Sequence, residues 1–395
     1  MDSSMKNEYN KYLLPIINSD DYIIKSGKGL YLIDEYGNEL LDCNGGQFCT
    51  IFGHSNEYFK EILEKVNNTL VHTNVYSYSL SVLKASKQLD SIMLGFNPRS
   101  IFLSTGSEAI NFSIKYARHY TKKKMVITND HSFLAISNNF EKNLFSTITT
   151  PLNSSDVAAS LQEFELLASS NQVACFTIEP IISMGGMLFL PQEFFVGLRE
   201  ICNKYHILLI FDESQCGFAR TGKWYYYQQI NVVPDIIISA KGVGNGYPVS
   251  VVSVNANFVN EQDPIATAST HQNAPYAASI VSAGIDYIEK NNLLNNNLDN
   301  GNYFLQKLKE LCYHKKLFNN PRGLGLMCAI DINNTNYQVI FNDLKNYCLR
   351  NNLIINGTSK GKTIRFIPPY TISTKEIDYI ISVLNDYNEM ELAHE

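Results

Sequence analysis

Residues 206–241 read HILLIFDESQCGFARTGKWYYYQQINVVPDIIISAK and contain two short apolar runs that each end at a chargeable side chain. The first run, 207–211, is followed by Asp212, and the second, 236–238, leads to Lys241. Continuous runs of Ile, Leu and Phe of this length are typical of strands that are buried on both faces of a sheet. We therefore predict two central strands here, with a polar group at the end of each.

Further short apolar runs alternate with helical patterns on both sides of this stretch. Apolar runs predict strands at 101–104, 173–180 and 248–254. Amphipathic spacing predicts helices at 107–120 and 192–205. Strands that alternate with helices are usually parallel, because the chain crosses over between them. The fold is therefore predicted to be α/β, with a mostly parallel central sheet in a large domain and a smaller α+β unit towards the C-terminus.

The composition and charge of the chain exclude several classes of protein. The 395 residues are 45% hydrophobic and 18% charged, which is ordinary for a globular protein. The net charge of −6 offers no basic footprint for nucleic acid and no polybasic patch for a membrane surface. The eight cysteines form no metal-ligand spacing, and the N-terminus lacks a signal-peptide pattern. We predict a cytoplasmic protein without a metal, nucleic-acid or membrane partner.

The segment STGSEA at 104–109 follows a predicted strand and opens a helix. Backbone N–H groups at a helix N-terminus, together with the hydroxyls of Ser104, Thr105 and Ser107, can hold a phosphate group. The alternative is an ordinary N-cap by Thr105 or Ser107, with Glu108 in the first turn. The segment alone leaves both interpretations open.

Asp212 and Lys241 are the two chemically informative strand ends. A carboxylate at the mouth of a buried strand needs a partner such as a protonated cofactor nitrogen, a metal ion or an arginine. A lysine at a poorly solvated strand end has its free amine available for Schiff-base chemistry. The glycines within 242–246 do not form a dinucleotide-binding fingerprint, because Tyr247 and Pro248 follow them and no helical pattern does.

Taken in order, these segments resemble the class III aminotransferases, the ornithine- and acetylornithine-transaminase-like group of fold type I pyridoxal-phosphate enzymes. The resemblance extends from about residue 28 to the C-terminus, and its most specific part runs from Asp212 to Pro248. The other matching stretches are GLYLIDEYGNELLDCNGG, FGH at 52–54, FLSTGSEAINFSIKYAR, IEPIISMGG, PRGLGLMCAID and TIRFIPPYTIS. The resemblance implies pyridoxal 5′-phosphate as the cofactor. It also implies a large cofactor-binding domain over 61–295 and a small domain in which an N-terminal segment, 1–60, joins 296–395.

The resemblance assigns roles to individual residues. Lys241 would hold the cofactor through a Schiff base, and Asp212 would keep its pyridine nitrogen protonated. Thr270 would reach the phosphate bound by the neighbouring subunit, which implies a homodimer with shared active sites. Arg365 would bind a substrate carboxylate through its guanidinium fork, and a surface ion pair is the alternative. The other cofactor contacts expected from the resemblance are Thr105, Gly106, Ser107, Phe133, Glu179, Ser214 and Gln215.

Several positions depart from the family pattern, and they concern the substrate more than the cofactor. The stretch NDHSFLAIS places Asp130 where the family has an aromatic residue stacked on the cofactor ring, so Phe133 is expected to stack instead. The same stretch lacks the arginine found in ornithine-like members. Met184 replaces a glutamate that pairs with the carboxylate-binding arginine, which would leave Arg365 permanently available. These changes favour a specialised or biosynthetic pathway over housekeeping arginine or ornithine metabolism.

The resemblance predicts an aminotransferase that moves an amino group from an amino acid or amine to a 2-oxo acid. Racemases, epimerases and aminomutases of the same family keep the same lysine, aspartate and phosphate site, so they remain an alternative. A non-catalytic relative of the fold is disfavoured, because a drifting fold would lose some of the residues that are all present here, namely Gly106, Asp212, Gln215, Lys241 and Thr270.

Overall fold

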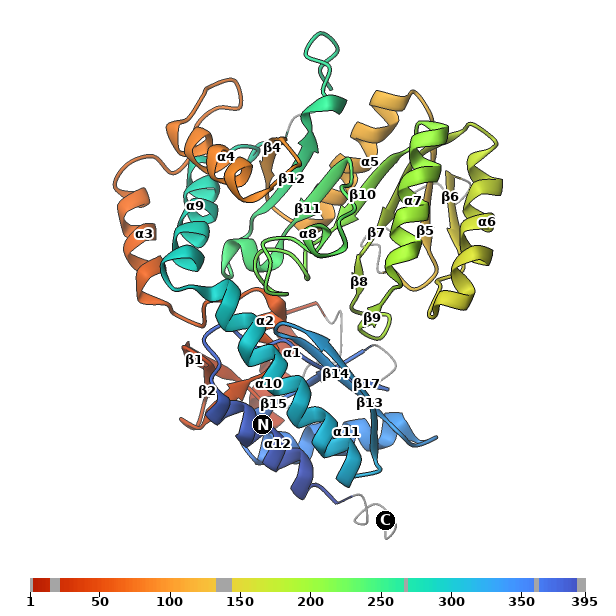
Figure 1. Ribbon diagram of the computed structural model, residues 1–395. Helices are drawn as coiled ribbons and strands as arrows, with labels where there is room; N and C mark the ends of the chain where they lie inside the picture. Colours follow the sequence, from red (N-terminus) through yellow and green to blue (C-terminus); the bar gives the residue numbers. More distant parts are fainter. Residues whose placement is uncertain (1–2, 15–21, 133–143, 266–268, 359–361, 389–395) are drawn as a thin grey trace.

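The computed structural model describes residues 3–14, 22–132, 144–265, 269–358 and 362–388. Figure 1 shows a large part built around one sheet, above a smaller part in which the N-terminal strands lie beside the C-terminal helices. The long helix α10 (Leu293–His314) begins beside the large part and runs down along the smaller one.

The large part is organised by a sheet of seven strands. In spatial order these are β4 (Pro98–Leu103), β12 (Ser250–Asn255), β11 (Ile236–Ser239), β10 (Leu208–Asp212), β7 (Val173–Ile178), β5 (Met125–Asn129) and β6 (Phe145–Ile148). The helices of this part are α3 (Glu57–Asn67), α4 (Leu80–Ile92), α5 (Gly106–Thr121), α6 (Val157–Ala168), α7 (Gln192–Tyr205), α8 (Tyr227–Ile230) and α9 (Pro275–Lys290). Together they confirm the predicted α/β fold with a mostly parallel sheet.

One strand, β12, runs antiparallel to both of its neighbours, β11 and β4. The connection from β11 to β12 spans residues 240–249 and contains only a short 3-10 turn, η3 (Lys241–Gly244). A parallel strand needs a longer crossover, so the chain turns back directly instead. The predicted strand at 248–254 is therefore present, and its direction is the exception in the sheet.

The central strands are buried on both faces, as the continuous apolar runs indicated. In β10, Leu208 and Ile210 belong to the apolar cluster that packs under α5. The alternate residues, Leu209 and Phe211, belong to the larger cluster that includes α7, where the Phe211 and Phe195 rings meet edge to face at 5.7 Å. Helices on both faces thus hold the sheet in place and leave the strand ends as its accessible edge.

The smaller part combines two further sheets. One has the order β1 (Ile24–Lys28), β2 (Tyr31–Asp34), β3 (Glu39–Asp42) and β15 (Leu353–Ile354), so the N-terminal strands pair with the C-terminal region. The other has the order β13 (Phe318–Leu324), β14 (Met327–Ile332), β17 (Thr363–Phe366) and β16 (Asn356–Gly357). Helices α11 (Tyr337–Arg350) and α12 (Thr374–Asp386) complete this part, and α1 (Ser3–Tyr12) precedes it.

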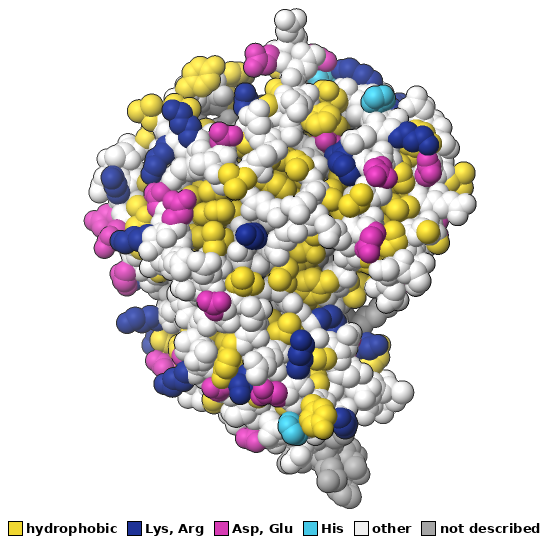
Figure 2. Space-filling view, viewed as in Figure 1, with side chains coloured by type: hydrophobic (Ala, Val, Ile, Leu, Met, Phe, Trp, Pro, Cys, Tyr) yellow, Lys and Arg dark blue, Asp and Glu magenta, His cyan; other side chains and the backbone are white. Residues whose placement is uncertain are grey.

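The surface in Figure 2 shows basic and acidic side chains interspersed over the visible face rather than separated by sign. Within the part of the chain that the structure describes, no helix combines the length and the apolar character needed to cross a membrane.

Arg220 joins the two parts of the molecule. Its side chain is fully buried, and Nη1 donates hydrogen bonds to the backbone oxygens of Leu326 at 3.2 Å and Pro368 at 2.6 Å. The guanidinium also lies 4.5 Å from the centre of the Tyr370 ring. Burial lowers the pKa of Arg220, although charge-assisted hydrogen bonds of this kind favour the cation. These contacts fix the C-terminal part against the loop that follows β10.

Replacing this guanidinium should therefore destabilise the whole protein. We expect Arg220→Met to lower the free energy of unfolding by about 3 kcal/mol, because two buried carbonyl groups lose their donor. Urea unfolding of the purified protein measures the change. The exposed Arg99 offers a matched control, for which Arg99→Met should change the stability by less than about 0.5 kcal/mol. Equal effects of the two substitutions would refute the joining role of Arg220.

Candidate functional site

A cavity of about 380 Å³ opens where β4, β7, β10 and β11 end. Since β7, β10 and β11 are parallel, their carboxyl ends meet at one edge of the sheet, which is where ligands of open α/β sheets bind. The cavity wall brings together nine residues that the sequence had singled out: Ser104, Thr105, Gly106, Ser107, Glu179, Asp212, Ser214, Gln215 and Lys241.

One wall of the cavity is the N-terminus of α5. Thr105 is the N-cap, and its hydroxyl accepts a hydrogen bond from the backbone N–H of Glu108 at 3.1 Å. A Cβ atom at Gly106 would lie 3.3 Å from the Cβ of Ala240, so the turn approaches the end of β11 closely. The N-cap therefore exists, and the first N–H groups of this 16-residue helix still form a positive end at the cavity.

Asp212 and Lys241 line the same cavity from adjacent strands. Asp212 pairs with Ile238 across the β10–β11 ladder, and Lys241 follows three residues later. The Asp212 Oδ1 atom accepts a hydrogen bond from the backbone N–H of Ser214 at 3.0 Å, while no described residue donates to Oδ2. Lys241 has a left-handed backbone with φ 49°, and no carboxylate of a described residue lies within ion-pair distance of its amine. The site thus presents a half-bonded carboxylate and an unpaired amine.

Gln215 and Glu179 form a polar contact at the end of β7. The Gln215 side-chain nitrogen donates to Glu179 Oε2 at 3.4 Å. Gln215 Oε1 is buried and has no hydrogen-bond partner among the described residues. An unsatisfied buried acceptor is costly, and a hydroxyl group of a ligand in the cavity would satisfy it.

Arg365, on β17, is not part of the cavity wall. It is 1% exposed, so the alternative of a surface ion pair is wrong. Its Nη1 donates to the Ser183 hydroxyl at 3.0 Å and its Nη2 to the Gly357 oxygen at 3.2 Å, while the Phe48 ring centre lies 5.0 Å from the guanidinium. Burial lowers the pKa of Arg365 to about 10, and the charge of Glu179 acts in the opposite direction. This cation is held by neutral groups.

Two other predicted residues are Thr270 and Phe133. Thr270 is exposed and is not part of the cavity wall. Phe133, the expected stacking residue, lies outside the described residues. Three residues earlier in the chain, Asp130 Oδ1 accepts hydrogen bonds from the backbone N–H and the hydroxyl of Thr150, and it contacts His131 Nδ1 at 2.8 Å. The Asp130 carboxylate is therefore already hydrogen-bonded to its neighbours Thr150 and His131.

Seven residues of the wall were not predicted, namely Cys49, Ile110, Ala240, Gly246, Tyr247, Pro248 and Val249. Ala240 and the run 246–249 lie within eight residues of Lys241 along the chain, and this proximity was a usable signal. Ile110 could have been placed on the first turn of α5 by helical spacing. Cys49 comes from a distant N-terminal segment, for which no local pattern exists. Burial raises the pKa of its thiol, and the nearby Lys241 amine acts in the opposite direction.

Glu213 is adjacent to Asp212 but points into the protein. It is buried, and its two carboxylate oxygens accept hydrogen bonds from the backbone N–H groups of Tyr226 at 2.6 Å and Tyr227 at 3.0 Å. Burial nevertheless raises the pKa of Glu213 to about 7. Glu213 therefore orders the loop after β10, whereas its neighbour Asp212 serves the cavity.

The chain is similar over nearly its whole length to known aminotransferases. The family model described as "Aminotransferase class-III" matches residues 17–164 and 143–387. The acetylornithine aminotransferase of Aquifex aeolicus is 31% identical over 377 residues, covering 91% of this chain and 95% of that protein. The acetylornithine aminotransferase of Methanocaldococcus jannaschii is 28% identical, with 95% and 96% covered, and the succinylornithine transaminase of Salmonella newport is 27% identical, with 95% and 94% covered.

Solved structures share the fold. A transaminase from the marine bacterium Virgibacillus superposes with a TM-score of 0.91 at 22% identity, covering 97% of this chain and 98% of that one. A Bacillus anthracis aminotransferase gives 0.88 at 23% identity, with 98% of each chain covered. These likenesses support the fold type I architecture.

The buried Glu213 should make the stability depend on pH. Its folded-state pKa of about 7 lies above the ordinary value of 4.5, so the folded protein binds the proton more tightly than the unfolded chain does. Its contribution to stability is full below about pH 4.5 and is lost as the pH rises to about 7. The free energy of unfolding should be measured across this pH range for the wild type and for Glu213→Gln. The difference between the two values should shrink as the pH rises. A difference that stays constant with pH would contradict the raised pKa.

Proposed function

The chain belongs to the class III aminotransferases, and from this premise we propose that it binds pyridoxal 5′-phosphate in the cavity at the strand ends. We further propose that it moves an amino group from an amino acid or amine to a 2-oxo acid. The observation that carries this proposal is that Lys241, Asp212 and the N-terminus of α5 share one cavity of about 380 Å³.

The residues present fit this cofactor. A cavity of this size suits a small molecule. The N-terminus of α5, with Thr105, Gly106 and Ser107, suits a phosphate group. The open Oδ2 atom of Asp212 suits a protonated ring nitrogen, and the unpaired Lys241 amine suits an aldehyde.

Other wall residues suit the edge of the cofactor ring. The unsatisfied Gln215 Oε1 can accept a hydrogen bond from a ring hydroxyl, and Ser214 and Glu179 lie beside it in the wall. We retain Phe133 as the proposed stacking residue.

The protein's own groups then divide the work. When bound, pyridoxal phosphate supplies an aldehyde that condenses with amines and a ring that accepts electrons from the neighbouring carbon. Lys241 would hold the cofactor through its amine, and the same amine, once freed by a substrate, would be the base that moves the proton of the substrate's amine-bearing carbon. Asp212 would keep a proton at the ring nitrogen, and the cavity walls would exclude water.

Arg365 is the proposed binding group for a substrate carboxylate. It is a buried guanidinium without a carboxylate within ion-pair distance among the described residues, and its Nε has no partner there. Met184, where the family usually has a glutamate, offers no competing charge. A buried arginine held only by neutral groups retains donors for an anion, which favours substrates that carry a carboxylate.

We also propose that the site is completed by a second subunit in a homodimer. Large apolar side chains are exposed at Leu70, Val71, Tyr76, Tyr78, Leu80 and Leu83. This face adjoins the loop that carries Thr270, since the His72 and His271 rings lie 5.2 Å apart and Tyr276 N donates to Val71 O at 3.3 Å. A homodimer would bury the apolar face and bring Thr270 to the partner's phosphate.

We also propose a cytoplasmic location and a specialised or biosynthetic pathway. All eight cysteines are free, as expected in a reducing compartment. The named relatives act on acetylornithine or succinylornithine by their names, and the departures at Asp130 and Met184 favour a different donor here.

The visible absorption spectrum tests the cofactor and the reaction together. The wild type with added pyridoxal phosphate should form a yellow species, and one donor from a panel of amino acids, diamines and N-acetylornithine should bleach it lastingly. Lys241→Ala should form no such species and lose transamination, because the amine that carries the cofactor is gone.

A matched control is Lys223→Ala, which removes an exposed lysine and should leave both results unchanged. A wild type that stays colourless would refute the cofactor. A spectrum that shifts with a donor but is never bleached would favour the racemase or aminomutase alternative.

The dimer has a separate test. Leu80→Glu places a charge on the exposed apolar face, so the variant should be monomeric by light scattering and should bind pyridoxal phosphate more weakly, because Thr270 of a partner is missing. Leu166→Glu, at an exposed apolar position on α6, should remain dimeric with unchanged cofactor affinity. A monomeric wild type, or a monomeric Leu80→Glu with full cofactor affinity, would overturn the shared-site proposal.

A further inference from the structure

The hairpin formed by β8 (Ile181–Ile182) and β9 (Leu188–Phe189) is the structural support of Arg365. Its turn begins at Ser183, which is fully buried and whose hydroxyl accepts the hydrogen bond from Arg365 Nη1 at 3.0 Å. The backbone N–H groups of Gly186 and Met187 both donate to the Ser183 oxygen, at 3.2 and 3.0 Å. The position of this hydroxyl therefore follows the position of the turn.

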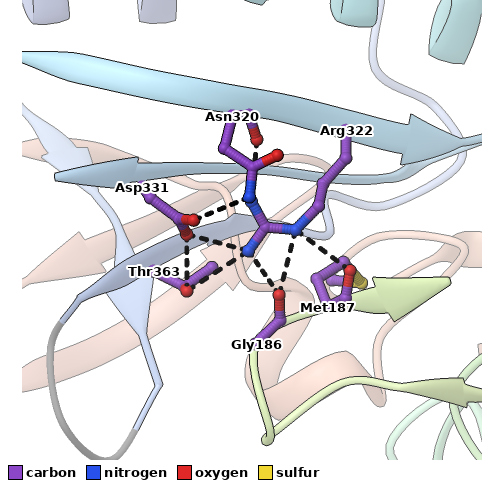
Figure 3. A network of polar contacts seen from close by, with 6 residues as sticks. All are labelled: Gly186, Met187, Asn320, Arg322, Asp331 and Thr363. Carbon is purple, nitrogen blue, oxygen red and sulfur yellow. Dashed lines mark hydrogen bonds and ion pairs between the residues drawn. The ribbon is translucent and has the colours of Figure 1, made fainter. Parts of the chain in front are cut away.

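A second arginine, on β13, clamps the other end of this turn. Figure 3 shows Arg322 reaching from the C-terminal sheet to the backbone oxygens of Gly186 and Met187. Its Nε donates to these oxygens at 3.0 and 3.1 Å, and its Nη2 also donates to Gly186. The far side of the guanidinium is held by Asp331 Oδ1 at 2.8 Å.

Arg322, with its partners Asp331 and Thr363, lies on the same face of the sheet as Arg365. Thr363 donates its hydroxyl hydrogen bond to Asp331 Oδ1 at 2.7 Å, and Arg365 is two residues further along β17. Residues two apart in a strand point to the same side, so Arg322, Asp331 and Thr363 hold the hairpin over the face that carries Arg365. The turn also packs closely on its other side, because a Cβ atom at Gly185 would lie 2.6 Å from the His131 backbone oxygen.

The two hydrogen bonds that hold Arg365 leave some of its N–H donors available. Nη1 and Nη2 each make one hydrogen bond, and Nε makes none with the described residues. Both acceptors are neutral, so neither cancels the charge. Glu179 is a member of the cavity wall, and its charge acts on the Arg365 guanidinium. The hydrogen bonds to Ser183 and Gly357 thus set the position from which Arg365 would bind a carboxylate that enters from the cavity.

We propose that the β8–β9 turn, residues 183–187, is the specificity-determining element for carboxylate-bearing ligands. Ser183 is the positioning residue for Arg365, and Arg322 is the positioning residue for the turn. The inference rests on the proposed function of Arg365 as the carboxylate-binding group. It adds that this function is set by a hairpin of the large part and an arginine of the C-terminal sheet, neither of which belongs to the cavity wall.

Binding of glutarate, a dicarboxylate that cannot react, tests this proposal on the cofactor-loaded enzyme. Calorimetry should show that Ser183→Ala weakens glutarate binding about tenfold, because Arg365 loses a hydrogen bond made by a charged donor. Arg322→Gln should produce a similar loss through the displaced turn, and Arg322→Lys a smaller one. The affinity for pyridoxal phosphate should stay unchanged in all three variants.

Matched controls separate positioning from general damage. Ser113→Ala removes another fully buried hydroxyl, which donates to the Ala109 oxygen at 2.8 Å on α5. Arg199→Gln removes another partly buried arginine–aspartate pair, with Asp235 at 2.9 Å. Both controls should bind glutarate as the wild type does.

The opposite outcomes are equally clear. A Ser183→Ala enzyme that binds glutarate as well as the wild type, or more tightly, would overturn the proposal, as would an equal loss in the controls. If the wild type and Arg365→Gln bound glutarate with equal affinity, Arg365 would not be the group that binds the carboxylate. Since glutarate undergoes no reaction, these outcomes are independent of whether the enzyme transaminates the donors tested.

Discussion

The hydrogen-bonded register of β10 with β11 is the constraint on which the site depends. It sets Asp212 opposite Ile238, so that the turn after β11 brings Lys241 to the same edge of the sheet. Both strands are packed by apolar clusters on their two faces, and a shift of one residue would turn every side chain to the wrong face. The core therefore fixes the relation between a carboxylate and an amine that themselves contribute little to packing.

The same alternation that protects the core separates two kinds of acidic residue. Asp212 lines the cavity, while Glu213, the next residue, turns inward and accepts hydrogen bonds from the loop at Tyr226 and Tyr227. One carboxylate keeps an oxygen available for a ligand, and the other is used to order the loop. Two adjacent acids at the end of β10 thus have different roles, because Asp212 faces the cavity and Glu213 faces the loop.

The sequence was most informative where the functional residues lie within short segments. The end of β4 with α5, the end of β10 and the turn at Lys241 are each contiguous, so apolar runs and helix-start patterns located most of the cavity wall. The antiparallel direction of β12 and the place of Cys49 in the wall depend on how distant segments pack, which no local pattern records. Arg365 was singled out from the sequence, yet its burial and its contacts with Ser183 and Phe48 depend on distant segments.

The buried Arg220 and the partly buried Arg322 explain how the C-terminal part can influence a site built on the large sheet. Arg220 extends from the loop after β10 to carbonyl groups at Leu326 and Pro368, and Arg322 extends from β13 to the carbonyl groups of the β8–β9 turn. Arg220 thus extends from the large part to the C-terminal part, whereas Arg322 extends from the C-terminal part to the large part. Hydrogen bonds to carbonyl oxygens are directional, so they fix orientation as well as contact. Arg365, which stands on the C-terminal sheet, therefore takes its position relative to the cavity from the contacts of both arginines.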